Sequence, residues 1–78
     1  MPAALILVNS DLGKEAEVVK AIRAINSVTE AHVVYGVYDA LVKLDAKTMD
    51  QLNEAIMKHV RSIPNLRSTI TMIVVEGQ

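Results

Sequence analysis

A weak internal repeat at an offset of 38 residues is the feature that most constrains how this chain folds. Apolar residues recur at that offset in two series: Val18, Ile22, Ile25 and Val28, and then Ile56, Val60, Ile63 and Leu66. In both series the spacing predicts the buried side of a helix, followed by a short polar turn and the start of a strand. The chain is therefore expected to contain the same helix-to-strand unit twice.

Four segments have the apolar composition or the alternation typical of β-strands, namely residues 3–8, 29–35, 40–44 and 67–75. Residues 3–8 are continuously apolar, which predicts a central strand with both of its faces covered. Gly36 and Asp39 bracket a short connection, because glycine tolerates positive φ and aspartate favours turns. The second and third strands are therefore expected to form a hairpin.

Two helices are predicted between these strands. One covers about residues 14–25, and the other follows Thr48, which forms a capping box with Gln51, and ends before Pro64. The resulting order predicts an α+β fold, the ferredoxin-like βαββαβ plait, with a four-stranded antiparallel sheet and two helices on one face. Residues 1–78 are too few for more than a single domain.

The hydrophobic fraction of the chain, 51%, is high for so small a domain. Two helices cover one face of the sheet, yet the first, second and fourth predicted strands carry apolar residues on both faces. The uncovered face is therefore expected to pack against a second copy in a two-fold contact, which makes the protein a homo-oligomer.

Several classes of function find no support in the sequence. The chain has no cysteine, and His32 and His59 have no partner at metal-ligand spacing, since Glu54 stands five residues before His59 and off its side of an α-helix. Phosphate-binding and dinucleotide-binding motifs are also absent, so no metal, no cofactor and no enzymatic activity are expected.

Charge and hydropathy argue against two further kinds of partner, DNA and membranes. The net charge is −1 and the basic residues are spread along the chain, so direct DNA binding is not expected. The apolar run at residues 3–8 is far too short to span a membrane and lacks the charged start of a signal peptide. An ordinary cytoplasmic protein is therefore predicted.

One polar cluster remains as a candidate binding site. It consists of hairpin residues and of hydroxyl residues on the last strand: Tyr35, Gly36, Tyr38, Asp39, Ser68, Thr69 and Thr71. An amino acid ligand needs a carboxylate for its ammonium group and neutral donors for its own carboxylate, and the cluster contains both. A turn and a strand face without any ligand have the same composition, so this alternative stays open.

Two segments of the chain resemble a known family. Residues 33–42 (VVYGVYDALV) and 63–71 (IPNLRSTIT) are similar to the effector-binding, or RAM, domain of the Lrp/AsnC transcription regulators, and the resemblance extends from the first strand to Val75. Asn65 stands at a turn where the family often has glycine. Full-length members carry an N-terminal helix-turn-helix domain, and this chain begins at the first strand, so it resembles the stand-alone members.

The resemblance implies a fold of the dimeric α/β barrel type, in which dimers close into rings of four or five, as octamers or decamers. It also implies that small effectors, usually amino acids, bind between dimers near the hairpin. Carried over, the Asp39 carboxylate binds the ligand ammonium, Gly36 offers backbone groups and Tyr38 lines the pocket, with Thr69 and Thr71 nearby. Ser68 is a further member of this set.

The implied function is a stand-alone amino-acid-sensing and oligomerisation module that acts on transcription indirectly, by joining full-length Lrp/AsnC relatives. Two alternatives stay open. One is a small dimeric α/β barrel enzyme with a pocket between sheet and helices, although only apolar residues are expected there. The other is a purely structural assembly protein.

Overall fold

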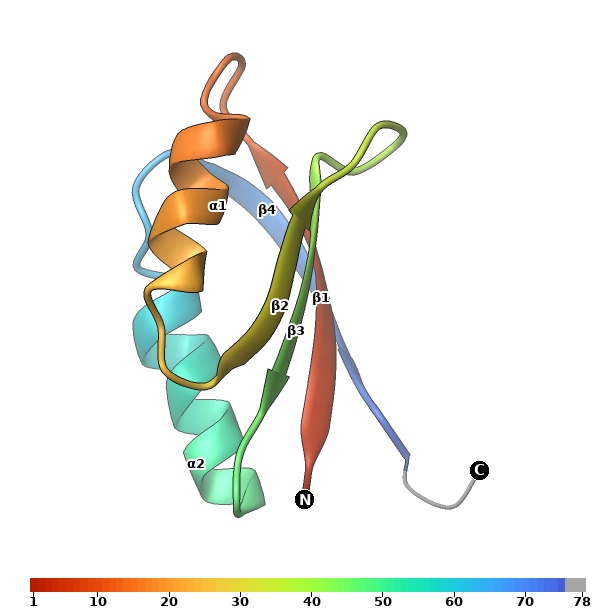
Figure 1. The fold of residues 1–78 in the computed structure, drawn as a ribbon, viewed down its shortest axis with the longest axis vertical. Helices are drawn as coiled ribbons and strands as arrows, with labels where there is room; N and C mark the ends of the chain where they lie inside the picture. The colour runs from red at the N-terminus through yellow and green to blue at the C-terminus, as the bar shows by residue number, and fades with distance from the viewer. Residues whose placement is uncertain (76–78) are drawn as a thin grey trace.

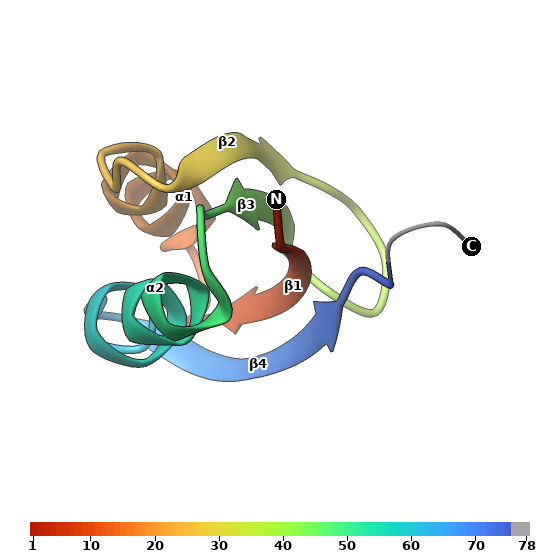
Figure 2. The same cartoon turned by 90° about the horizontal axis from the view of Figure 1, so that it is seen from below.

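The fold is described by a computed structural model for residues 1–75. Its elements follow in the order β1 (Ala3–Ser10), α1 (Glu15–Arg23), β2 (Val28–Val33), β3 (Ala40–Asp45), α2 (Met49–Glu54), the π-helix η1 (Ala55–Val60) and β4 (Leu66–Ile73). The strands form one antiparallel sheet in the order β2-β3-β1-β4. Both helices lie on one side of this curved sheet (Figures 1 and 2). The predicted ferredoxin-like plait is confirmed.

The second helix differs from its prediction in type. An α-helix was expected up to Pro64, but α2 is followed directly by η1, and the Arg61 N–H donates to the Ile56 carbonyl, five residues back, at 3.1 Å. Ile56 and Val60 of the predicted apolar series are buried all the same, as is Leu52 one turn earlier. Residues spaced by four stay on one side of the helix when its turn widens, so the spacing does not distinguish the two helix types.

The core lies between the helices and the sheet. Its largest fully buried side chains come from both helices and the two central strands: Ile6, Val8, Val18, Ile22, Val42, Leu44, Leu52 and Val60. Both halves of the 38-residue repeat contribute, because Ile25, Val28, Ile63 and Leu66 pack as half-buried residues against this core. Among residues 1–75, no helix is long and apolar enough to cross a membrane.

Within a single chain only one face of β1 is covered. Ala4, Ile6 and Val8 are buried under the helices, whereas Leu5 and Leu7 alternate with them onto the opposite face and are half-buried. The prediction that both faces are covered therefore does not hold within one chain.

The face that the helices leave uncovered is called the open face. Leu7 lies beside Leu41 of β3 and Ile70 of β4, and Leu5 lies beside Met72. Ile70 and Met72 are 45% and 42% exposed. The open face thus has an apolar centre contributed by β1, β3 and β4.

The second strand was predicted to contribute apolar residues to this face, and that prediction is wrong. Ala31 is buried on the helix side, and the alternation of β2 therefore places Glu30 and His32 on the open face, opposite Lys43 and Leu41. The border of the open face along β2 is polar for this reason.

The expected N-cap of the second helix is present, and its removal has a measurable cost. Thr48 is extended (φ −133°, ψ 160°), and its Oγ1 accepts a hydrogen bond from the Gln51 N–H at 3.1 Å. Thr48→Ala leaves this N–H without its partner and should lower the free energy of unfolding by about 1 kcal/mol. Urea denaturation measures the loss. Thr48→Ser, which keeps the hydroxyl, should unfold close to the parent, and equal stability of all three proteins would show that the cap contributes nothing.

Candidate functional site

The β2–β3 connection presents Asp39 at the end of β1. Gly36 has φ +146°, a conformation that residues with a side chain rarely adopt, and this turns the chain back toward the sheet. The Asp39 N–H donates to the Val8 carbonyl at 2.9 Å, and its Oδ2 accepts from the Ser10 N–H at 3.0 Å. Both bonds hold a half-buried carboxylate in a fixed place, 29 residues away from Ser10 in sequence.

A β-bulge lies directly opposite, where β4 begins. Asn9 pairs with Ser68 and Ser10 pairs with Leu66, so Arg67 is the additional residue of β4. Bulges of this kind change the direction of a side chain and often lie next to binding sites. The Asn9 Nδ2 donates to the Ser68 Oγ at 3.4 Å on the same border.

The turn before the bulge places Asn65 in a backbone conformation that glycine favours. Asn65 has φ 69°, in the left-handed region that asparagine tolerates better than most residues with a side chain. Its carbonyl accepts from the Asp11 N–H at 2.7 Å. The turn and the start of β4 are thereby fixed to the end of β1.

These residues surround a cavity of about 390 Å³. Its lining consists of Asn9, Ser10, Val37, Asp39, Arg67 and Ser68, and we call it the Asp39–Arg67 cavity. Its volume lies within the range of roughly 300–1,000 Å³ that is common for small-molecule sites. The guanidinium of Arg67 has no hydrogen bond or ion pair with any residue from 1 to 75. The lining of the cavity therefore includes one acidic and one basic residue, and the basic residue has no partner among residues 1–75.

A second cavity, of about 290 Å³, is also lined by Asp39. It is mostly apolar and is lined by Glu15, Ala16, Val33, Val34, Tyr35 and Asp39. Asp39 thus lines both a polar cavity and an apolar one.

The predicted site residues are brought together only in part. Asp39 and Ser68 line the Asp39–Arg67 cavity, whereas the exposed Tyr35 lines the apolar cavity. Gly36 and the half-buried Tyr38 lie in the connecting loop and line neither of these two cavities.

Thr69 and Thr71 lie on the other face of the sheet. They pair with the buried Val8 and Ile6 and therefore project toward the helices. The Thr71 Oγ1 is buried and has no hydrogen-bond partner among residues 1–75.

Sequence reasoning did not find four of the lining residues, which are Asn9, Ser10, Val37 and Arg67. The end of β1 and the start of β4 become neighbours only through antiparallel pairing, and the bulge that makes Arg67 the additional residue depends on that pairing. Position next to Ser68 was the one local signal that could have indicated Arg67.

A cavity at the opposite end of the molecule brings Glu54 and His59 together. This cavity of about 610 Å³ is lined by ten residues, among them Asp45, Lys47, Glu54 and His59. Glu54 was expected to lie off the side of His59, but the wider turn of η1 brings both residues to this one cavity. Among residues 1–75, no three histidine, cysteine, aspartate or glutamate side chains are grouped closely enough to hold a metal ion.

Comparison with known sequences agrees with this architecture. Residues 3–77 match the Lrp/AsnC ligand binding domain. The HTH-type transcriptional regulator FL11 of Pyrococcus abyssi is 34% identical over 73 residues, which cover 94% of this chain and 48% of FL11. A homocitrate synthase of Saccharolobus solfataricus is 37% identical over 59 residues, 76% of this chain but 13% of the enzyme. The chain thus spans less than half the length of these two relatives, and the likeness to the synthase concerns a small part of that enzyme.

Solved structures show the same similarity. FFRP-DM1 is 40% identical, with a TM-score of 0.90 over 96% of this chain and 100% of its own. A transcriptional regulator of Neisseria meningitidis, 17% identical, has the same fold with a TM-score of 0.80 over 97% of this chain and 51% of its own. The match over nearly all of the sequence, together with the plait and its hairpin, shows that the chain belongs to the Lrp/AsnC family, as a ligand binding domain of that family.

Proposed function

We propose that this protein is a regulatory module that senses a small amino acid and self-associates, acting on transcription through partner regulators. The observation that supports this most is the pair of opposite charges along one cavity, the Asp39 carboxylate and the Arg67 guanidinium, which has no partner among residues 1–75. A free amino acid has the complementary pair, an ammonium group and a carboxylate separated by one carbon atom.

The lining suggests an orientation for such a ligand. Oδ2 of Asp39 already accepts from Ser10, which leaves Oδ1 to accept from the ligand ammonium. Arg67 offers the fork geometry that binds a carboxylate through two parallel bonds. Val37 is the one apolar side chain of this lining, and the ligand side chain would lie against it.

Self-association forms the second part of the proposal. Leu5, Leu7, Leu41, Ile70 and Met72 give the open face an apolar centre that no element among residues 1–75 covers. A two-fold contact between two open faces would cover this centre on both chains at once. Dimers formed in this way would assemble further into rings of four or five, as octamers or decamers.

The proposal that the protein acts on transcription indirectly rests on the packing of both helices against the sheet. Val18 and Ile22 of α1, and Leu52 and Val60 of the second helix, are buried against the sheet, so neither helix is free to enter a DNA groove with that side. The proposal therefore assigns the effect on transcription to association with full-length Lrp/AsnC regulators in the cytoplasm. Direct duplex binding is not part of it.

A thermal-shift panel of the twenty amino acids tests the sensing function. A ligand at one hundred times its Kd stabilises the folded state by about 2.7 kcal/mol, which for a domain of this size raises Tm by roughly 10 °C or more. Methionine belongs in the panel for a further reason, since the Neisseria regulator was solved in complex with L-Met. We expect at least one amino acid to raise Tm, with calorimetric titration giving its Kd. No shift with any of the twenty, in a protein that still assembles, would favour a purely structural assembly protein.

A further inference from the structure

β2 forms one edge of the sheet, and half of its backbone groups face outward. The Val34 N–H donates to the Asp39 carbonyl at 2.9 Å, and the bonded pairs with β3 alternate from there. Glu30 and His32 therefore bond to β3, whereas Ala31 and Val33 turn their N–H and C=O groups to the free edge. Such a row of outward groups is a template for another strand.

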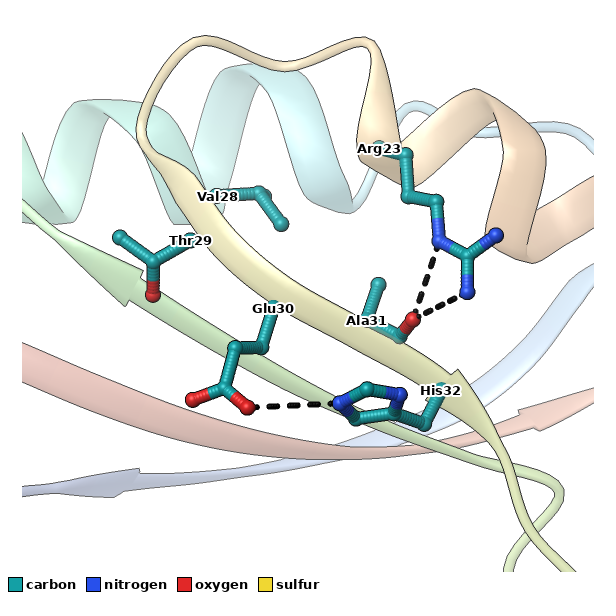
Figure 3. A pocket seen from close by; sticks show the side chains of 6 residues that line it. All are labelled: Arg23, Val28, Thr29, Glu30, Ala31 and His32. Atoms are coloured by element: carbon teal, nitrogen blue, oxygen red, sulfur yellow. Dashed lines mark hydrogen bonds and ion pairs between the residues drawn. The ribbon is translucent and has the colours of Figure 1, made fainter.

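Arg23 occupies the centre of this edge. Its Nε and Nη2 both donate to the Ala31 carbonyl, at 3.0 and 2.7 Å. Figure 3 shows the guanidinium reaching from the end of α1 to the strand, beside a cavity of about 270 Å³ along β2. The guanidinium thus takes the position that a backbone N–H of an added strand would occupy. While it stays there, the centre of the edge is closed.

The sequence of β2 is complementary to itself. Two antiparallel copies related by a two-fold axis join their outward groups only if an outward-facing residue of one copy lies opposite an outward-facing residue of the other, and Ala31 and Val33 are such residues. An axis at Ala31 places Glu30 of each copy opposite His32 of the other. An axis at His32 would place the two His32 side chains opposite each other, and an axis at Val33 would place His32 opposite Val34.

Only the register centred on Ala31 therefore pairs a carboxylate with an imidazole across the strands, and it does so twice. A carboxylate and an imidazole directly across an antiparallel pair stabilise it through a hydrogen bond, or through an ion pair when the imidazole is protonated. Glu30 and His32 are accessible to a second copy, since their side chains are 57% and 56% exposed. Within one chain they contact each other at 3.4 Å, and the pairs across the strands would replace this contact.

We propose that the β2 edge is a self-association surface, that its occupant is β2 of a second copy in the register centred on Ala31, and that Arg23 keeps it closed. The backbone edge of β2 is separate from the apolar centre of the open face, although Glu30 and His32 lie at the polar border of that face. Contact through the open face buries side chains, whereas pairing at the β2 edge extends the sheet through backbone hydrogen bonds and leaves the apolar centre of the open face accessible.

The test compares Arg23→Ala with the parent at equal concentration. Lys20→Ala is the matched control, because Lys20 is a basic, exposed residue in the same last turn of α1 and has no bond to β2 among residues 1–75. Sedimentation velocity should show assemblies of at least twice the parent mass for Arg23→Ala, because every subunit carries a β2 edge, and no rise for Lys20→Ala. Hydrogen exchange should show new protection of the Ala31 and Val33 amides.

Changing the charges tests the register. Adding Glu30→Lys to Arg23→Ala places a lysine opposite each His32 and should return the mass to that of the parent. The exchange Glu30→His with His32→Glu restores a carboxylate opposite each imidazole and should restore the higher mass.

Two results would overturn the proposal. The first is a folded Arg23→Ala protein with the mass and amide exchange of the parent. The second is a higher mass that persists when Glu30→Lys is added, because the association would then use another surface. If Arg23→Ala does not fold, Arg23→Lys replaces it, since lysine keeps the charge but has no fork to hold the carbonyl, and the same two results decide.

Discussion

Leu7→Asp should convert the assembled protein into monomers. Leu7 lies in the middle of the open face, between Leu41 on β3 and Ile70 on β4. A two-fold contact uses the same patch on both chains, so the substitution places two carboxylates in one apolar interface. Removing each carboxylate from water costs several kcal/mol, and we expect the Kd of the dimer to rise at least about 1,000-fold.

Light scattering after gel filtration measures this change, and circular dichroism verifies that the chain is folded. Met57→Asp is the matched control, because Met57 is an apolar residue of η1 that is 58% exposed and lies in the helix layer. It introduces the same charge outside the open face and should leave the mass unchanged. A folded Leu7→Asp protein with the mass of the parent would place the interface elsewhere.

Asp39→Asn should remove most of the affinity for the amino acid that stabilises the parent. The variant deletes the charge that the proposal assigns to the ligand ammonium but keeps an oxygen that can accept from the Ser10 N–H. Loss of a desolvated charge partner costs about 2–5 kcal/mol, which corresponds to a Kd roughly 30- to 5,000-fold higher. Asp39→Ala is a poorer choice, because it also leaves the Ser10 N–H without its acceptor.

Arg67→Gln tests the other end of the same ligand. It should weaken binding to a similar degree, since the variant removes the charge assigned to the ligand carboxylate. Arg61→Gln is the control, because Arg61 is an exposed arginine outside the cavity lining. Calorimetric titration gives the Kd of each protein, and urea denaturation should show each within about 1 kcal/mol of the parent. Full affinity in both Asp39→Asn and Arg67→Gln would exclude this cavity as the binding site.

Thr69→Val tests on which face of the sheet the ligand binds. Thr69 projects toward the helices in a single chain, so loss of its hydroxyl should leave binding in the Asp39–Arg67 cavity unchanged. A loss as large as that of Asp39→Asn would show that the binding site includes the hydroxyl groups of β4 on the helix side, as the family resemblance implies.

The sequence by itself determined the order of the elements, the core and the hairpin. Ile22 and Val60 are buried because the spacing of apolar residues within a helix selects one side of it, and this spacing is visible over a few residues. The hydroxyl part of the capping box at Thr48 was equally local, since donor and acceptor are three residues apart. The resemblance to the Lrp/AsnC family also depended on short, contiguous segments.

Only the tertiary structure decided which side chains meet at the candidate site. Ser68 and Thr69 are neighbours in sequence, yet they lie on opposite faces of β4, and the pairing with Asn9 and Val8 fixes which face each one has. Arg67 reaches the cavity as the additional residue of a bulge, and Asp39 is held there by Ser10. These placements depend on the pairing of segments far apart in the chain, for which local periodicity holds no information.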